Sequence, residues 1–540
     1  MPRPISPLSG NTLPVAAALL LAYCLAQLFL RHAFPFDETR YLAVAWEMWL
    51  RDDFLVPYVN GMPYSHKPPL LFWLMQAGWW LFGVSEWWPR LIPCLFALAS
   101  LVLVRRLALL LWPGKDGPAQ LAPLVLLSLP LWLFFSGLLL FDLVLVAFVL
   151  VSVYGAVLSL EDQQRGWAYL VFGLALGLLT KGPVMLLDSL PVILLAPFWY
   201  PQTKRRWGRW YAGVLAASLA GSLLALAWAV PAALSGGEEY ARMIGWHQTA
   251  DRLGKGYMHA RPWWWYLPLL IPLLFPWLFH PGLWQGLKRP LLDDNGVRFC
   301  LAWLLPVFLL LSLIGGKKVH YLVPLLPPAA LLISRLLGNR APSAPLRGAW
   351  LPGLLIALSG VLLSAIPLYL GRSPGHGWLR ELSPLWGLVV LAIGVMLFFA
   401  ARRTADFDRR LALAATLATA TALIGAFSTA APYHDLSGIS HRLASLQSAG
   451  HPLGHRGTHR EQFMLLGRLR RPLEKIPPGG VAAWARQHPD GYVATYFKYG
   501  KLPQGIKPLF RQPYRSSRIL VLYSSAQILT APERFAHAGR

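Results

Sequence analysis

The sequence predicts a polytopic α-helical membrane protein with a small soluble α/β domain at its C-terminus. Of its 540 residues 56% are hydrophobic, and apolar stretches of about 20 residues recur as far as residue 430. A helix of about 20 apolar residues is long enough to cross a bilayer. After Pro432 the proportions of Gly, His, Arg and Pro rise, and the runs 491–497 and 518–523 alternate as strands do.

The first apolar stretch, Leu13 to Leu30, is too long for a removable signal and lacks its small-residue cleavage site, so we expect it to be the first span. Segment 68–84 begins with two prolines and is short, which favours an interfacial helix in an outer loop. In all we expect about thirteen spans, at residues 13–31, 89–111, 120–137, 139–159, 166–182, 184–200, 210–233, 264–281, 299–315, 319–337, 349–371, 384–401 and 411–429.

Basic residues set the orientation, because short cytoplasmic loops are enriched in Lys and Arg. With the N-terminus in the cytoplasm, the arginine clusters at 105–106, 205–209, 402–403 and 409–410 all fall on the cytoplasmic side. The loop 34–88, the loop 234–263 and the segment 315–320 then lie outside. So does the soluble domain 431–540, which follows the membrane domain 1–430. From Asp435 to Arg540 it has 16 Lys/Arg against 5 Asp/Glu, which the rule permits because long domains translocate largely regardless of charge.

The net charge of +25 does not indicate a nucleic-acid partner, since the basic residues occupy short loops and the C-terminal segment rather than one compact soluble face. The phospholipid bilayer is the expected partner. The three cysteines lie inside apolar segments and offer neither a disulfide framework nor a spaced zinc site. No internal repeat supports a transporter built from paired halves.

Charged residues after the first span are the first candidates for chemistry. Asp37, Glu38, Arg40 and Tyr41 follow it directly, although a solvated loop start would also explain them. Asp142 stands in the apolar run L-L-F-D-L-V at the outer end of the fourth predicted span. Carboxylates within the membrane are costly and usually functional, and the alternative for Asp142 is a capping residue at the interface.

Cations gather on the same side. Lys181, in L-L-T-K-G-P, ends the fifth predicted span, where a lysine could also extend its amine to the interface. Lys67, Arg252 and the pair Lys317 and Lys318 lie in the outer loops. Two carboxylates with several cations are suited to binding a phosphate-bearing lipid and moving a group at its headgroup.

Histidines and tryptophans are weaker indicators. The outer loops hold four histidines, and none of their spacings is that of a tight ligand pair, so a divalent metal is left open. The tryptophan runs at 79–80, 87–88 and 263–265 are explained by an aromatic belt at the membrane interface.

Five motifs resemble, in this order, a known family: D-E-T-R-Y at 37–41, D-F-L-V-P-Y-V-N-G-M-P-Y-S-H-K-P-P-L at 53–70, L-T-K-G-P at 179–183, H-A-R-P-W-W-W-Y at 259–266 and K-K-V-H-Y-L-V-P-L-L-P at 317–327. They are similar to the bacterial aminoarabinose transferases of lipid A modification. That family belongs with the protein O-mannosyltransferases among the membrane glycosyltransferases of the GT-C class. The resemblance covers residues 20–335 and extends further only in outline.

The resemblance implies an inverting transfer of a sugar from a polyprenyl phosphate, such as undecaprenyl phosphate, to lipid A or another envelope acceptor. The site would face the periplasm from the bacterial inner membrane. Asp37, nearest the reacting sugar, and Asp142 would be the catalytic carboxylates. The implied substrate-binding residues are Glu38, Arg40, Tyr41, Lys67, Lys181, Arg252, Lys318 and Tyr321.

One position departs from the family pattern. The family often has Glu before the lysine of K-P-P, and here that residue is His66. A Glu-His metal site therefore does not transfer unchanged. His66 and His247 are the candidate ligands for a divalent metal, and no cofactor is otherwise implied.

In the mechanism that we expect, Lys67 and Arg252 stabilise the charge that develops on the departing polyprenyl phosphate. Asp37 orients the acceptor or takes its proton; a lipid A phosphate needs little base catalysis, whereas a hydroxyl needs a base. A protein O-mannosyltransferase, or a transferase for another envelope glycan, is the alternative. A transporter of lipid-linked sugars is disfavoured, because its charges should lie near the midplane rather than at the outer ends of the spans.

Overall fold

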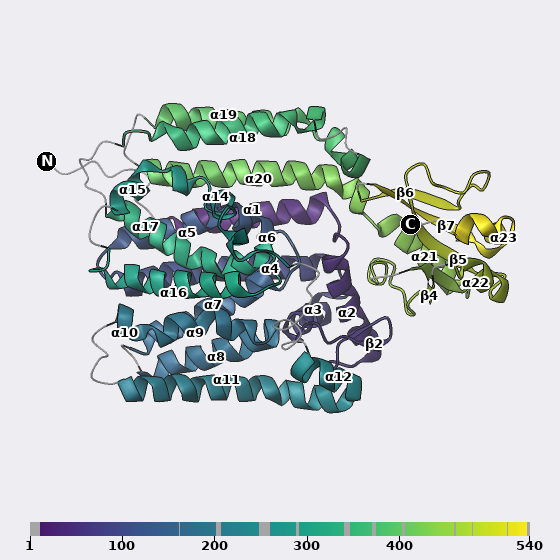
Figure 1. Cartoon of the computed structure of the whole chain (residues 1–540), viewed down its shortest axis with the longest axis horizontal. Coiled ribbons are helices and arrows are strands. Elements are labelled where there is room, and N and C mark those ends of the chain that lie inside the picture. Colours follow the sequence, from purple (N-terminus) through teal and green to yellow (C-terminus); the bar gives the residue numbers. More distant parts are fainter. Residues whose placement is uncertain are drawn as a thin grey trace.

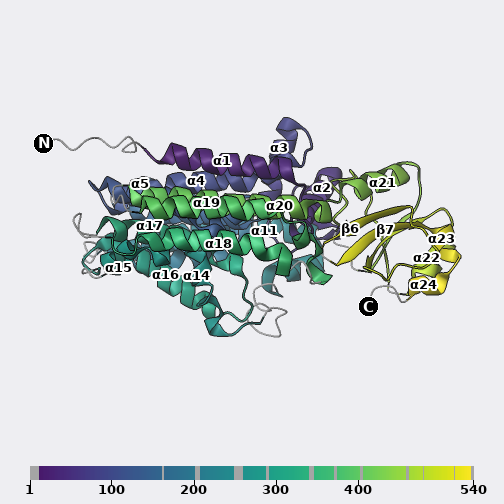
Figure 2. The ribbon, with the colours of Figure 1, turned by 90° about the horizontal axis from the view of Figure 1, so that it is seen from above.

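The computed structural model describes residues 11–160, 163–200, 207–247, 260–287, 291–339, 346–369, 374–401, 406–457, 461–477, 479–515 and 517–536. Long helices lie side by side along the longest dimension of the molecule (Figures 1 and 2). The C-terminal domain covers one end of this bundle, and helix α1 (Leu13–Leu30) begins toward the other. We call the end that faces the C-terminal domain the outer end.

Within the described ranges, seven helical segments are long and apolar enough to cross a membrane, or eight if a bent pair forms one span. The protein is therefore a multi-pass membrane protein, as predicted, whereas the count of thirteen spans stays a prediction. The helices of the bundle are α1 (Leu13–Leu30), α4 (Trp87–Leu111), α5 (Asp116–Ser128), α6 (Pro130–Ser136), α7 (Asp142–Leu158), α8 (Gln163–Lys181), α9 (Val184–Leu194), α10 (Ala196–Trp199), α11 (Trp207–Ser235), α16 (Asn295–Leu313), α17 (Leu326–Gly338), α18 (Trp350–Tyr369), α19 (Pro384–Ala400) and α20 (Phe407–His434).

Prolines break two segments that we predicted as single spans. Residues 120–137 form α5 and α6, which bend by 69° at Pro130. Residues 264–281 form only short pieces, because prolines recur every four residues from 268 to 276 and each removes a backbone donor and clashes with the preceding turn. The pieces are η3 (Trp263–Tyr266), α14 (Leu270–Leu273) and η4 (Trp277–Phe279), followed by α15 (Pro281–Leu287).

The outer loop 34–88 is ordered by α2 (Asp37–Arg51), the hairpin β1 (Tyr58–Val59) and β2 (Met62–Pro63), and α3 (Leu70–Phe82), the helix expected at 68–84. Asn60 and Gly61 form the hairpin turn, and both have the positive φ that this tight turn requires. Their backbone N–H groups donate to the Glu47 carboxylate over 2.6 and 2.9 Å. Helix α2 therefore fixes the hairpin that leads into the H-K-P-P segment.

The C-terminal domain is a five-stranded mixed sheet of order β4-β3-β5-β7-β6. The expected strands are present as β5 (Tyr492–Lys498) and β7 (Arg518–Ser524), which pair antiparallel. Strands β3 and β4 lie parallel on one side of β5, and β6 pairs antiparallel with β7. The other elements are β3 (Leu453–Arg456), β4 (Glu474–Ile476), β6 (Phe510–Tyr514), α21 (Ser437–Ser448), α22 (Val481–Gln487), α23 (Ser525–Leu529) and α24 (Pro532–Ala536).

The C-terminal domain shares a hydrophobic core with the outer loop. One cluster of buried side chains includes Trp46 of α2, Trp79 of α3, Phe141 and Leu469. The Trp46 indole also donates a hydrogen bond to the Leu469 carbonyl over 2.8 Å. The C-terminal domain therefore packs on the outer loop at the outer end of the bundle (Figure 1). The remaining short helices are α12 (Glu238–Arg242), η2 (Met243–His247), η5 (Val319–Leu325) and η7 (Pro374–Arg380).

Candidate active site

An ion pair fixes the start of α2. The Arg31 guanidinium binds both oxygens of Glu38, over 2.6 and 3.1 Å, and both residues are buried. Glu38 also accepts hydrogen bonds from the backbone N–H of Phe34 (2.8 Å) and Leu139 (2.7 Å). Burial raises the pKa of Glu38, but Arg31 outweighs it and holds that pKa below its ordinary value. Glu38 thus ties α2 to the end of α1 and to the segment before α7, and its role in substrate binding stays a prediction.

Asp37 precedes Glu38 and has a different environment. Its side chain is 61% exposed, and the nearest charge is Arg40 at 3.4 Å, one turn along α2. A carboxylate in the first turn of a helix is favoured by the helix dipole. Arg40 also bonds the Tyr64 hydroxyl, and burial raises the pKa of that phenol to about 12. Asp37 is therefore held at the helix terminus with its oxygens open to an incoming group.

Asp142 and Lys181 form a second ion pair. Asp142 is the first residue of α7 and Lys181 the last of α8. Lys181 Nζ lies 2.7 Å from Asp142 Oδ1, and each side chain is only 8% exposed. Two residues that the sequence singled out separately thus meet at the outer end of adjacent helices. The ion pair adds to the capping alternative rather than replacing it, because Asp142 also stands in the first turn of α7.

Further candidates surround this pair. Lys181 Nζ lies 5.6 Å from the centre of the Tyr321 ring, within reach of a cation–π contact. His320 packs edge-on against Tyr321, with ring centres 4.8 Å apart. The Asp142 carboxylate also interacts electrostatically with His320 and Lys67. Segments far apart in the sequence therefore bring three cationic or titratable side chains to one carboxylate.

Phe141 connects this cluster to the outer loop. Lys67 Nζ lies 5.3 Å from the centre of the Phe141 ring, and the Tyr41 ring packs edge-on against the same ring at 4.8 Å. Tyr41 is buried, and its hydroxyl interacts electrostatically with Asp37 and Asp142. The cluster thus continues from α7 and α8 to α2 and the H-K-P-P segment.

Other predicted residues are less closely joined to the cluster. Lys318 is exposed, and its carbonyl accepts a hydrogen bond from Tyr266. The adjacent Lys317 is buried and donates to the carbonyls of Arg261 and Ile314 over 3.2 and 2.5 Å. It thus joins the segment before η3 to the segment after α16. Arg252 lies outside the described residues.

The candidate metal ligands are placed only in part. His66 is exposed and packs edge-on against Tyr64 at 5.4 Å. His247 ends η2, and its side chain lies outside the described part of the chain. Where the structure describes side chains, no three His, Cys, Asp or Glu residues lie close enough together to hold a metal ion. A metal held by His66 and His247 stays a prediction.

The sequence reasoning missed Asp188. This residue lies on α9, is 1% exposed, and interacts electrostatically with Lys181 and Asp142. Neither of its carboxylate oxygens has a hydrogen-bond partner among the described residues. The signal that could have found it is the one that identified Asp142, a lone carboxylate in an apolar run, here V-M-L-L-D-S-L.

The fold and the charged cluster at the outer end of the bundle define a membrane glycosyltransferase of the GT-C class. Residues 66–233 match the family described as dolichyl-phosphate-mannose-protein mannosyltransferase. The fold is similar to the crystal structure of ArnT from Cupriavidus metallidurans bound to undecaprenyl phosphate. The TM-score is 0.76 at 19% identity, over 95% of this chain and 98% of the other.

Curated relatives identify the family. The chain is 30% identical over 404 residues to the undecaprenyl phosphate-alpha-4-amino-4-deoxy-L-arabinose arabinosyl transferase of Edwardsiella ictaluri, covering 71% of this chain and 70% of the relative. It is 32% identical over 412 residues to the protein of the same name from Pseudomonas aeruginosa strain UCBPP-PA14, covering 74% and 72%. The chain belongs to this family of arabinosyl transferases, and the resemblance found in the motifs is confirmed.

Proposed function

We propose that this protein transfers 4-amino-4-deoxy-L-arabinose from undecaprenyl phosphate to lipid A, at the periplasmic face of the bacterial inner membrane. The names of the relatives support the donor, and the basic C-terminal segment suits an anionic acceptor. The observation that carries the proposal is the buried Asp142–Lys181 pair with Lys67 beside it. This cluster lies where the outer loop covers the ends of α7 and α8.

The reaction requires stabilisation of the negative charge of the leaving phosphate, on the donor side of the sugar. The bond between the sugar C1 and the phosphate oxygen of the donor breaks, and a bond between C1 and the acceptor oxygen forms with inversion. Undecaprenyl phosphate leaves with the electron pair of the broken bond. Lys67, together with Arg252, would stabilise its charge in a site from which water is largely excluded. Lys181, held in place by Asp142, would offer the remaining N–H donors of its ammonium group to the phosphate.

Asp37 would act on the acceptor side, because it is the exposed carboxylate of this region. If the acceptor is a lipid A phosphate, the attacking oxygen is already anionic, and Asp37 then orients the acceptor or the sugar. If the acceptor is a hydroxyl, Asp37 would take its proton. The pH dependence of turnover separates the two, since only the second requires an ionised base in the rate-limiting step.

Mass spectrometry of lipid A tests the proposal. Lipid A from cells that express the gene should carry one added aminopentose mass, which should be absent after deletion and restored by the wild-type gene. Unchanged lipid A in all three strains would show that lipid A is not the acceptor. The match to the mannosyltransferase family at 66–233 then favours a protein hydroxyl as acceptor, and glycopeptide analysis of envelope proteins would detect it.

A further inference from the structure

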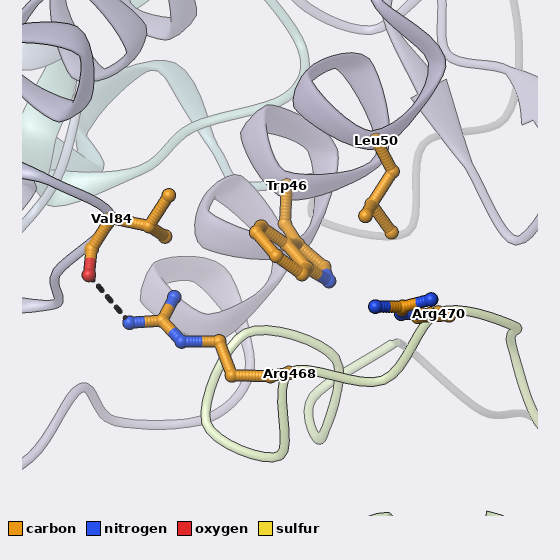
Figure 3. A pocket seen from close by; sticks show the side chains of 5 residues that line it. All are labelled: Trp46, Leu50, Val84, Arg468 and Arg470. Atoms are coloured by element: carbon orange, nitrogen blue, oxygen red, sulfur yellow. Dashed lines mark hydrogen bonds between the residues drawn. The ribbon is translucent and has the colours of Figure 1, made fainter. Parts of the chain in front are cut away.

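A groove lies between α2 and the C-terminal domain. Trp46 and Leu50 of α2 line it together with Val84, which lies in the turn between α3 and α4. Arg468 and Arg470 of the C-terminal domain complete it, on either side of the Trp46 ring (Figure 3). The groove therefore has one apolar wall and two guanidinium groups, which is the composition of a site for an anionic amphiphile.

The first guanidinium is held in place. Arg468 Nη2 donates to the Val84 carbonyl over 2.7 Å, and its Cζ lies 5.4 Å from the centre of the Trp46 ring. These contacts fix the side chain but use only part of its five donors. Glu86 is the acidic group that acts on Arg468, and its carboxylate is already bound by His32 at 2.8 Å.

The second guanidinium is open. The backbone N–H of Arg470 donates to Gln447 Oε1 over 2.8 Å, so the loop that carries it is anchored to α21. The Arg470 side chain is exposed and has no hydrogen-bond or charged partner among the described residues. A fixed loop thus presents a free guanidinium beside the indole of Trp46 (Figure 3).

An exposed apolar rim lies beside the groove, in the chain on either side of Val84. The end of α3 and the start of α4 expose Trp80 (78%), Leu81 (64%), Phe82 (55%) and Trp87 (44%). Large apolar and aromatic side chains exposed together at the end of a membrane bundle mark contact with the bilayer interface. Val84 lies in the turn between these exposed residues, so the guanidinium that binds its carbonyl lies next to the apolar surface that would meet the membrane interface.

The groove is separate from the candidate active site. Trp46 follows Asp37 by nine positions on α2, which at about 100° per residue puts the two on opposite faces of the helix. Tyr41 lies near the Asp37 face, whereas Leu50 lies near that of Trp46. A lipid in the groove is therefore not an acceptor in position for transfer.

We propose that this groove binds the phosphate of an anionic phospholipid from the leaflet on the side of the C-terminal domain. Guanidinium groups bind phosphate through paired, charge-assisted hydrogen bonds, and the exposed apolar rim would contact the acyl chains. Because its two arginines belong to the C-terminal domain and its apolar wall to the outer loop, the bound lipid joins the two parts. The lipid acts as a structural ligand that holds the domain over the bundle.

Native mass spectrometry of the full-length protein in detergent tests this site, with added phosphatidylglycerol and with phosphatidylcholine as the zwitterionic comparison. The wild-type protein should retain phosphatidylglycerol in preference to phosphatidylcholine. Arg470→Gln and Arg468→Gln/Arg470→Gln should weaken phosphatidylglycerol binding, the double variant by about tenfold or more. Lys475→Gln/Arg486→Gln removes the same charge from exposed positions elsewhere in the domain and should bind as the wild type does.

Three outcomes would overturn the proposal. In the first, Arg470→Gln, which leaves the Arg468 contacts intact, binds phosphatidylglycerol with wild-type affinity. In the second, both double variants lose binding equally, so that only net charge matters. In the third, the wild type binds purified lipid A in preference to phosphatidylglycerol and the double variant loses that preference, which would identify the occupant as the acceptor. Thermal unfolding of each variant separates loss of the site from loss of the fold.

Discussion

Lys181 Nζ lies 2.7 Å from Asp142 Oδ1 at the outer end of the bundle, and both side chains are almost fully buried. Asp142 stands at the start of α7 and Lys181 at the end of α8, the next helix along the chain, and the two helices are in contact. In such surroundings each charge depends on the other, because an unpaired ion is expensive to bury. Tyr321 and Lys67 lie close to the same pair.

Removing one partner of this pair should be costly. We expect Asp142→Asn to abolish transfer and to lower the free energy of unfolding by about 3–5 kcal/mol, because Lys181 is left buried without a counter-charge. The measurement is thermal unfolding in nanodiscs together with turnover. In Asp142→Asn/Lys181→Met most of the stability should return while the activity stays lost. Equal instability of the single and double variants would contradict the pairing.

Asp37 should behave differently, since its carboxylate is exposed and Arg40 is the one ion-pair partner that it has among the described residues. Asp37→Asn should abolish or strongly reduce transfer with little change in the unfolding temperature. Asp52→Asn, at the other end of α2 and also exposed, is the matched control and should retain turnover. Near-normal turnover by Asp37→Asn would remove Asp37 from the mechanism.

Lys67 should act on the donor. Lys67→Ala should weaken binding of undecaprenyl phosphate by about tenfold or more, as expected for the loss of a charge-assisted contact to phosphate. Binding of the lipid to detergent-solubilised protein measures this directly. Lys115→Ala, an exposed lysine between α4 and α5 at the end of α4 that is far from the outer loop, should leave the affinity unchanged. An unchanged affinity in Lys67→Ala would refute the phosphate contact.

The sequence singles out Asp142 and Lys181 because a charge in an apolar run is conspicuous, yet their pairing depends on how α7 and α8 pack. It does not separate Asp37 from Glu38, since neighbours on a helix point about 100° apart and only the fold decides which one meets Arg31. Span 264–281 was wrong as a single helix because hydropathy outweighed its recurring prolines. The groove at Arg470 was beyond prediction, because it forms between segments more than 380 positions apart.

Stability should fall as the pH rises through the titration of His32. Its ring Nδ1 lies 2.8 Å from Glu86, and this hydrogen bond raises the pKa of His32 above its ordinary value. The stabilisation is fully present below the unfolded-state pKa of about 6.5 and disappears above the folded-state pKa. The unfolding temperature should therefore be higher at about pH 6, below both pKa values of His32, than at about pH 8.5, above both. His32→Gln should reduce this change in unfolding temperature with pH, and His441→Gln should leave it as it is. A pH profile of His32→Gln identical to that of the wild type would exclude His32 as the source of the change.

Substitution of Asp188 should change the free energy of unfolding in the opposite direction from substitution of Asp142. Both carboxylates are buried in neighbouring helices, but neither oxygen of Asp188 has a hydrogen-bond partner among the described residues, whereas Asp142 has Lys181. A buried polar group without partners costs stability, so Asp188→Leu should raise the free energy of unfolding by about 1–3 kcal/mol. Asp142→Leu is the matched substitution and should lower it, because Lys181 loses its partner. Thermal unfolding of the two variants side by side measures the contrast. Destabilisation by Asp188→Leu would mean that this carboxylate has a partner in the membrane. The candidate is Lys181, the cation that interacts electrostatically with it.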